Sequence, residues 1–368
     1  MRRAFLLMAI CGLFAVACSG DTTASSPTPV ATADIKRSKL DISYSGFVDQ
    51  DVHHVTSKKA LEAALEAVKA EVRAAGGKDA VDTPAFQDTD EPQLADFNKF
   101  AQAVGRLAAN NTQLSANRIA DVAITGMIKA SPDCHTYYVD NSGQVRNSSG
   151  KIPTGTGAMI PAQGTSLGGP DQAGLSGKML TGGVAYITWH EFAINGTYRI
   201  TDMVKAMLDK ALAQGAKAWL FDLRGNVGGN GADLMASWFL NGEPTLSVVV
   251  KTGNAGTMTA NKDLRLPAAY QLPIAVILND RGGSAPEVLG ASLKENKRAT
   301  IVGKQSVGCL GATSPTHMND GAEISVTVQE FTGALTGTKY NNNGIVPDVA
   351  ADDATAVDKA VEILKQKI

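Results

Sequence analysis

The sequence predicts an α/β fold, in which a largely parallel sheet is covered by helices and preceded by a small helical subdomain. Apolar residues recur at helical spacing between residues 51 and 130. After residue 180, short apolar runs typical of buried strands alternate with helical segments. The composition of the 368 residues, 44% hydrophobic and 19% charged, is that of a globular protein.

The charge balance argues against two classes of partner. A net charge of -2 provides neither a basic patch for nucleic acid nor a polybasic stripe for anionic membranes. No CxxC pair or His/Cys cluster typical of a zinc site is present in the sequence. We therefore expect no metal and no cofactor.

The N-terminus predicts export. Arg2 and Arg3 precede the apolar residues 4–17, a run too short for a membrane span, which needs about 20 residues. We interpret residues 1–17 as a lipoprotein signal peptide, because Ala15-Val16-Ala17-Cys18 resembles a bacterial lipobox, which implies a lipid on Cys18. The alternative is an ordinary signal peptide cleaved near Ala17. Residues 18–50 are expected to be a lipid anchor and flexible linker, rich at first in Ser, Thr, Pro and Ala.

Residues 51–130 are expected to form the helical subdomain. The segment 56–75 carries one apolar stripe, begins at a capping Thr56 or Ser57 and stops at a Gly-Gly pair. Further helices are expected at 92–109 and 115–130. We interpret the stripes as core packing.

The second half predicts the sheet. We expect strands at 184–189, 217–222, 274–278 and 299–302, and helices at 201–215, 232–240, 285–296 and 356–368. In such sheets, functional sites gather where strands end and helices begin.

Two strand-to-helix junctions carry candidate chemistry. The first contains Gly228 and Gly229, whose backbone N–H groups could face developing negative charge. The alternative is that the glycines only allow the chain to reverse direction, as in most glycine-rich turns. In the second, Ser284 stands at a sharp turn, and the N–H of Ala285 lies at a helix N-terminus, which favours an oxyanion. Taken alone, Ser284 is more often a helix cap than a nucleophile at such a place.

A third segment, Ser131 to Tyr137, follows the last N-terminal helix and contains His135. A nucleophilic serine needs a base, and the chain has five histidines. A lone histidine is usually a surface or core residue, so the residues alone leave the choice of base open.

Four ordered segments resemble the motifs of the S41 peptidase family: Asp222–Gly229, Gly283–Glu287, Arg298–Gly303 and Asn342–Asp348. The segment Asp133-Cys134-His135-Thr136 is similar to the Asp-Gly-His-Thr near the start of many members. The resemblance covers roughly residues 115–355. It implies a ClpP/crotonase-like sheet domain, serine peptidase activity, and Ser284 as the nucleophile.

The resemblance also implies which residues could serve as the base. The carboxy-terminal-processing branch uses a serine–lysine dyad, and Cys309 stands where the lysine is expected. Residues 140–180 are too few for the PDZ domain of that branch. The tricorn-like branch takes a histidine from the N-terminal segment, here His135. The supporting carboxylate aligns with Asn341, which can orient an imidazole but stabilises imidazolium less. Lys304 is an alternative base.

The two remaining cysteines gain an interpretation from the same resemblance. Cys134 adjoins the expected base, and Cys309 faces the expected nucleophile. A Cys134–Cys309 disulfide could then join the two segments, since an oxidising compartment permits it. Two buried free thiols are the alternative.

We therefore expect a peptidase domain at residues 131–355 and a C-terminal helix at 356–368. Ser284 and His135 are the expected catalytic pair, with Asn341 as the orienting residue. The N–H groups of Ala285 and of Gly228 or Gly229 are expected to bind the oxyanion. The substrates would be peptides or unfolded segments in the periplasm or at the cell surface. The alternatives are a binding protein or pseudoenzyme of the same fold, and an acyl transferase acting on other substrates.

Overall fold

The computed structural model describes residues 34–148, 153–155 and 157–368. The expected signal peptide at residues 1–17 and the expected lipidation site Cys18 lie outside these residues. Within the described part of the chain, no helix is both long and apolar enough to cross a bilayer.

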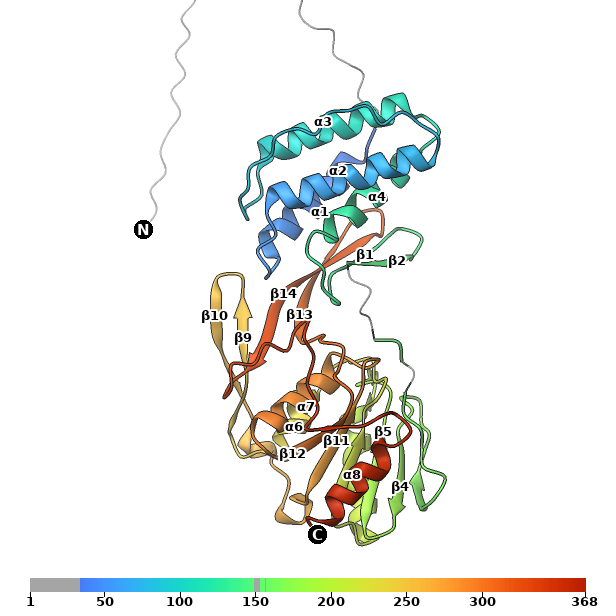
Figure 1. Ribbon diagram of the computed structural model, residues 1–368, viewed down its shortest axis with the longest axis vertical. Coiled ribbons are helices and arrows are strands. Elements are labelled where there is room, and N and C mark those ends of the chain that lie inside the picture. Colours follow the sequence, from blue (N-terminus) through green and yellow to red (C-terminus); the bar gives the residue numbers. More distant parts are fainter. Residues whose placement is uncertain (1–33, 149–152, 156) are drawn as a thin grey trace, which may run out of the picture. The chain divides into compact units, whose positions relative to one another are not determined.

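Four helices gather in the N-terminal part (Figure 1). They are α1 (Arg37–Gln50), α2 (Ser57–Ala74), α3 (Leu94–Asn110) and α4 (Ala116–Ile128). The three predicted helices are confirmed, and Thr56 caps α2 by accepting a hydrogen bond from the Lys59 N–H at 3.3 Å. The apolar stripe of α2 is buried as predicted.

The flexible linker expected for residues 18–50 is wrong over its second half, where α1 begins at Arg37. Leu40, Tyr44 and Phe47 are buried in the core of the helical subdomain. Tyr44 stacks on Phe97 of α3 with ring centroids 5.6 Å apart. Polar residues and a glycine interrupt the stripe of α1, so its burial depends on packing against distant helices, which local pattern does not reveal.

The predicted α/β half contains a seven-stranded sheet in the order β15-β12-β11-β8-β5-β4-β3. Its strands are β3 (Thr165–Gly168), β4 (Ser176–Leu180), β5 (Val184–Thr188), β8 (Ala218–Asp222), β11 (Ile274–Leu278), β12 (Ala299–Gly303) and β15 (Val349–Ala350). Strands β5 to β15 pair in parallel, and β3 and β4 are antiparallel. The predicted strands and the largely parallel sheet are confirmed.

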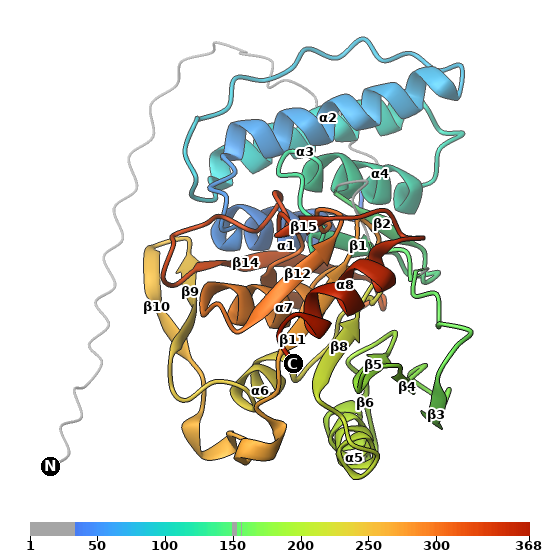
Figure 2. The same cartoon turned by 60° about the horizontal axis from the view of Figure 1, so that its bottom comes forward.

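Helices cover both faces of this sheet (Figure 2). They are α5 (Ile200–Ala213), α6 (Ala232–Ser237), α7 (Ala285–Glu295) and α8 (Ala356–Lys365), with short helices η1 (Lys262–Leu264) and η2 (Ala268–Tyr270). Alternate residues of β5 separate the faces. Ala185 and Ile187 pack in the core shared with α5, α6 and α7, whereas Val184 and Tyr186 pack with α8. The predicted C-terminal helix is therefore part of the sheet domain. Helix α5 begins at Ile200, one residue before the predicted start.

The second sheet was not predicted. It is antiparallel, in the order β10-β9-β14-β1-β2, and β13 also pairs with β14. Its strands are β1 (Tyr137–Val139), β2 (Val145–Asn147), β9 (Pro244–Val250), β10 (Gly253–Thr259), β13 (Gly311–His317) and β14 (Glu323–Gly333). A small hairpin joins β6 (Ile194–Asn195) and β7 (Tyr198–Arg199).

Strand β14 connects the two halves of the molecule. Its first residues pair with β1, and its last residues pair with β9. Tyr138, Ile324 and Val326 belong to the same core as helices α1 to α4. The strand thereby fixes the loop before β1 relative to the sheet domain, and both regions contain expected site residues.

Candidate active site

Ser284 lies between β11 and α7, at the N-cap position of the helix. Its backbone has φ 69° and ψ -120°, a conformation that non-glycine residues rarely adopt. The N–H of Ala285 has no acceptor within the helix because Ala285 is its first residue. The side chain of Ser284 faces a cavity of about 450 Å³.

Glu287 holds this turn in place. Its fully buried carboxylate accepts hydrogen bonds from the N–H groups of Ser284 at 3.0 Å, Gly308 at 2.7 Å and Cys309 at 2.7 Å, and from the Ser306 hydroxyl. Burial raises the pKa of Glu287, while these donors act in the opposite direction. The carboxylate therefore joins the start of α7 to the segment that carries Cys309.

The glycine turn lies directly against Ser284. A Cβ atom on Gly228, whose φ is 100°, would lie 3.0 Å from the Ser284 Oγ. The Asn226 side chain accepts the Gly228 N–H at 2.9 Å, and its backbone oxygen accepts the Gly283 N–H at 3.0 Å. The N–H of Gly229 has no hydrogen-bond acceptor among the described residues. Of the two expected oxyanion donors in this turn, Gly229 is thus the one whose N–H is available.

The Asp-Leu-Arg part of the first motif has a structural role. Arg224 and Asp222 are fully buried, and the guanidinium donates to both carboxylate oxygens, at 2.9 Å and 2.6 Å. Asp222 also accepts the Tyr186 hydroxyl at 3.0 Å. The two buried charges are therefore paired with each other and hydrogen-bonded, as buried charges require.

His135 and Ser284 line the same cavity. The other lining residues are Cys134, Tyr137, Val139, Val145, Asn147, Pro153, Val227 and Cys309. No hydrogen bond joins the Ser284 hydroxyl to the His135 ring, although both belong to the described part of the chain. Burial lowers the pKa of His135, with Asp133 opposing that change. The ring is therefore neutral at neutral pH, the form that a general base requires.

Cys134 and Cys309 form a disulfide in the structure. Cys134 Sγ lies 3.4 Å from Nδ1 of His135, and Cys309 packs against Gly283, the residue before Ser284. These two sulfurs and the His135 ring lie within 4.8 Å of one another. Because the sulfurs are bonded to each other, they offer no thiolate to a metal ion.

Asn341 and Lys304 do not contact the expected catalytic pair. The amide of Asn341 donates to Asp133 at 2.8 Å and to Glu330 at 3.0 Å, instead of contacting the His135 ring. The Lys304 ammonium lies 3.8 Å from Asp353 and is 40% exposed. A second hollow of about 480 Å³ beside Asp353 and α8 contains none of the expected catalytic residues.

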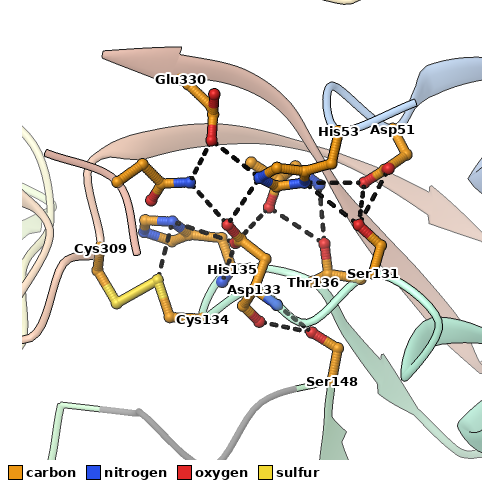
Figure 3. A network of polar contacts seen from close by, with 12 residues as sticks. Asp51, His53, Ser131, Asp133, Cys134, His135, Thr136, Ser148, Cys309 and Glu330 are labelled. Atoms are coloured by element: carbon orange, nitrogen blue, oxygen red, sulfur yellow. Dashed lines mark hydrogen bonds and ion pairs between the residues drawn. A yellow bond between two sulfur atoms is a disulfide. The ribbon is translucent and has the colours of Figure 1, made fainter. Parts of the chain in front are cut away.

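A buried polar network adjoins the histidine loop and was missed in the sequence (Figure 3). Asp51 and His53, from the connection between α1 and α2, contact Ser131, Asp133 and Glu330. Of these residues only Asp133 belongs to a recognised motif, and the network joins three distant parts of the chain. The only local sign is the polar stretch around His53, between two helices.

Ser131, His53 and Glu330 have the connectivity of a catalytic triad. The Ser131 hydroxyl lies 3.3 Å from one ring nitrogen of His53, and Glu330 lies 2.9 Å from the other. Desolvation by burial lowers the pKa of His53, but hydrogen bonds to Asp51 and Glu330 and the charges of Asp51 and Asp133 outweigh it and raise that pKa to about 10. A protonated ring cannot accept a serine proton, and Ser131 is buried and donates to Asp51. This group is therefore not a second catalytic triad.

Comparison with known proteins gives a consistent result. Residues 183–351 match the sequence model of Peptidase family S41. The carboxyl-terminal-processing protease of Synechocystis sp. is 32% identical over 40% of this chain and 33% of that protein. The carboxy-terminal processing protease CtpA of Bacillus subtilis is 28% identical over 48% of this chain and 36% of that protein. The chain thus spans about a third of the length of these relatives.

Two solved structures share the fold over a longer range. A lipoprotein from Streptococcus agalactiae has a TM-score of 0.53 at 17% identity, covering 75% of this chain and 90% of that chain. A protein from Parabacteroides merdae also has a TM-score of 0.53, at 16% identity, covering 83% of this chain and 96% of that chain. The expected α/β fold is confirmed.

Proposed function

Because residues 183–351 belong to peptidase family S41, we propose that this chain is an exported serine peptidase with Ser284 as nucleophile and His135 as base. Ser284 Oγ attacks the peptide carbonyl carbon while the neutral imidazole accepts the hydroxyl proton. The carbonyl electron pair moves to oxygen and returns as the C–N bond breaks. The imidazolium then protonates the departing amine, and water hydrolyses the acyl-enzyme by the same steps.

One observation carries this proposal: Ser284 and His135, 149 positions apart in the sequence, line one cavity. The hydroxyl and the ring are not hydrogen-bonded in the unliganded site, and such bonds often tighten only when substrate is bound. The unusual backbone of Ser284 supports the same role, since strained conformations cluster at functional sites.

The oxyanion would bind the N–H groups of Ala285 and Gly229. Ala285 opens α7, where the helix dipole favours negative charge. The N–H of Gly228 already donates to Asn226, so Gly228 contributes by its lack of a side chain beside Ser284.

The cavity walls suggest the class of substrate. Tyr137, Val139, Val145 and Val227 are apolar or aromatic, and the described residues that line the cavity include no Lys, Arg, Asp or Glu. We infer that it accepts a small or medium apolar side chain of a peptide next to the scissile bond, since burying a charged side chain there would leave it unpaired. The N-terminal residues further suggest that lipid on Cys18 holds the enzyme at a bacterial membrane, facing the periplasm or the cell surface.

Labelling with a serine-reactive fluorophosphonate tests the assignment. Ser284→Ala should abolish both labelling and peptide hydrolysis. Ser292→Ala, which changes a buried serine in the same helix, should keep both. Persistent labelling of Ser284→Ala would refute the nucleophile.

The second candidate is a peptide-binding protein without turnover. The missing Ser284–His135 hydrogen bond favours it, as does the disulfide sulfur beside the base. Peptide binding by the unmodified protein, with no hydrolysis and no labelling of Ser284, would identify this function.

A further inference from the structure

His53 lies among three carboxylates in the network of Figure 3. Its ring nitrogens lie 3.3 Å from Asp51, 2.9 Å from Glu330 and 3.6 Å from Asp133. Asp51 and Asp133 are fully buried. The hydrogen bond from His53 also lowers the pKa of Glu330. A buried group of three carboxylates needs a cation, and His53 supplies it.

Asp133 joins this network to the expected base. Its Oδ1 accepts hydrogen bonds from the backbone N–H of His135 at 2.8 Å and from the Thr327 hydroxyl at 2.6 Å. Its Oδ2 accepts the Asn341 amide at 2.8 Å. The same Oδ1 lies 4.0 Å from Nδ1 of His135. The carboxylate is thus held beside the ring from several sides.

The arrangement places negative charge where it would favour catalysis. When His135 takes the serine proton, its ring becomes an imidazolium, which a carboxylate within about 4–6 Å stabilises. Asn341 carries no charge, so it cannot supply this stabilisation. Asp133 is the carboxylate nearest to the ring, and its Oδ2 is held by Asn341 and approached by His53.

We propose that His53 is a positioning residue for this reaction: its imidazolium holds the Asp133 carboxylate beside His135, where Asp133 stabilises the charge that His135 acquires. The inference rests on the proposed function. It assigns a catalytic contribution to the helical subdomain, because His53 comes from the α1–α2 connection. It also gives Asn341 a role, as a second support of Asp133.

The test compares His53→Gln with Glu330→Gln in the full chain. The measurements are the rate constant for Ser284 modification by a fluorophosphonate and its pH profile. The charged groups around His53 are Asp51, Asp133 and Glu330, and Asp133 is the one facing His135. His53→Gln removes a positive charge while the hydrogen bonds of Asp133 to His135, Thr327 and Asn341 remain, so the acid limb of the profile should move to higher pH. Glu330→Gln removes a negative charge, so the limb should move to lower pH.

His53→Gln should also slow the modification about ten- to a hundredfold, because displacing a catalytic group by about 1 Å has effects of this size. The double variant His53→Gln/Glu330→Gln, which regains the original charge balance, should recover part of that loss. His317→Gln is the matched control, because His317 forms an exposed pair with Glu323 at 3.0 Å, outside the network. It should behave as the unmodified protein does.

The outcomes separate the two proposals. If the unmodified protein is not labelled at Ser284, the proposed function fails. If it is labelled and His53→Gln reacts within about twofold of it with the same acid limb, the positioning role is overturned. If His53→Gln does not fold, Glu330→Gln decides, and an unmoved acid limb overturns the role. Acid limbs that move in the same direction in both variants would also contradict the role. The two variants remove charges of opposite sign, so an electrostatic effect must move their acid limbs in opposite directions, whereas a general loss of structure need not.

Discussion

The backbone of Ser284 has a positive φ, and such a conformation costs about 1–3 kcal/mol in a non-glycine residue. Several contacts hold it there. Glu287 accepts the Ser284 N–H, and Asn226 accepts the N–H of the preceding Gly283. The neighbouring turn approaches so closely that only a glycine fits at position 228. The position of the hydroxyl therefore depends on this close contact.

Gly228→Ala should abolish activity by crowding the hydroxyl. The added methyl carbon would meet Ser284 Oγ at 3.0 Å and its Cβ at 2.7 Å, so one of them must move. We expect a fall in kcat/KM of about a hundredfold or more. Gly253→Ala is the control, since Gly253 also has a positive φ, 115°, but its new methyl group would meet nothing within 4 Å. Equal activity losses in both variants would attribute the effect to backbone strain alone.

If His135 is the base, as proposed, the pH profile of the unmodified protein should reflect the burial of this ring. Burial lowers the pKa of this ring below its ordinary value of 6.5. The neutral, basic form therefore persists below that pH, and kcat/KM should fall only on further acidification. A profile measured from pH 4 to 8 with a peptide substrate checks this. A half-maximal rate above pH 6.5 would be inconsistent with His135 as the base.

The sequence identified the candidate site residues that lie in recognisable motifs, but not those that lie outside them. Ser284 and His135 follow from short segments that resemble a family. His53 and Glu330 are separated by 277 positions and lie in no recognisable pattern. Their hydrogen bond forms because the α1–α2 connection packs against β14. Such a tertiary contact leaves no pattern in the sequence. The choice between Gly228 and Gly229 as oxyanion donor was likewise left open, because the bond of the Gly228 N–H to Asn226 depends on a side-chain conformation.

Among the elements, the parallel strands were predicted and the antiparallel sheet was not. The strands β5, β8 and β11 are buried on both faces and form continuous apolar runs. By contrast, β13 contains Pro315, and β10 begins with Gly253 and is mostly exposed. These features disfavour strands in isolation. They are tolerated here because β13 pairs with the long strand β14, and β10 pairs with β9.

Reduction of the disulfide should weaken the attachment of the histidine loop to the sheet domain. The bond joins residues 175 positions apart, so it restricts a large part of the unfolded chain. Removing such a bond typically costs about 2–5 kcal/mol. We expect Cys134→Ser/Cys309→Ser to lower the unfolding midpoint in urea. Non-reducing peptide mapping of the unmodified protein provides the control, and recovery of both cysteines as free thiols would contradict the bond.

The network around His53 should make stability fall with rising pH. The pKa of His53 is raised from 6.5 to about 10 in the folded protein, so the folded state retains a proton that the unfolded state loses between these values. The stabilisation is complete below pH 6.5 and disappears as the pH rises to about 10, by up to about 1.4 kcal/mol per pH unit.

Urea unfolding of the unmodified protein and of His53→Gln at pH 6.5, 8 and 9.5 measures this slope. The variant should lose less stability over this range than the unmodified protein does. Parallel slopes would show that His53 does not retain its proton.

At the scale of the whole molecule, the proposed site combines residues from two regions of the chain, one inside the segment that matches the family model and one before it. Ser284, Ala285 and Gly229 belong to the segment that matches Peptidase family S41. His135, Asp133 and His53 lie before that segment. Local periodicity predicted the parallel strands of the first region, because each parallel strand and its helix are near neighbours in the chain. The second region is assembled by contacts across the length of the chain, and from it the sequence predicted three helices, the histidine and the cysteine beside it.

The path of β14 has a consequence for when the proposed active site can assemble. The segment with His135 is synthesised before Ser284, but the strand after it pairs with β14, which is synthesised after Ser284. A polypeptide whose β14 has not yet been synthesised therefore contains both reactive groups before their common cavity can form. If the chain is the exported peptidase that we propose, this order delays its activity until the whole chain has folded.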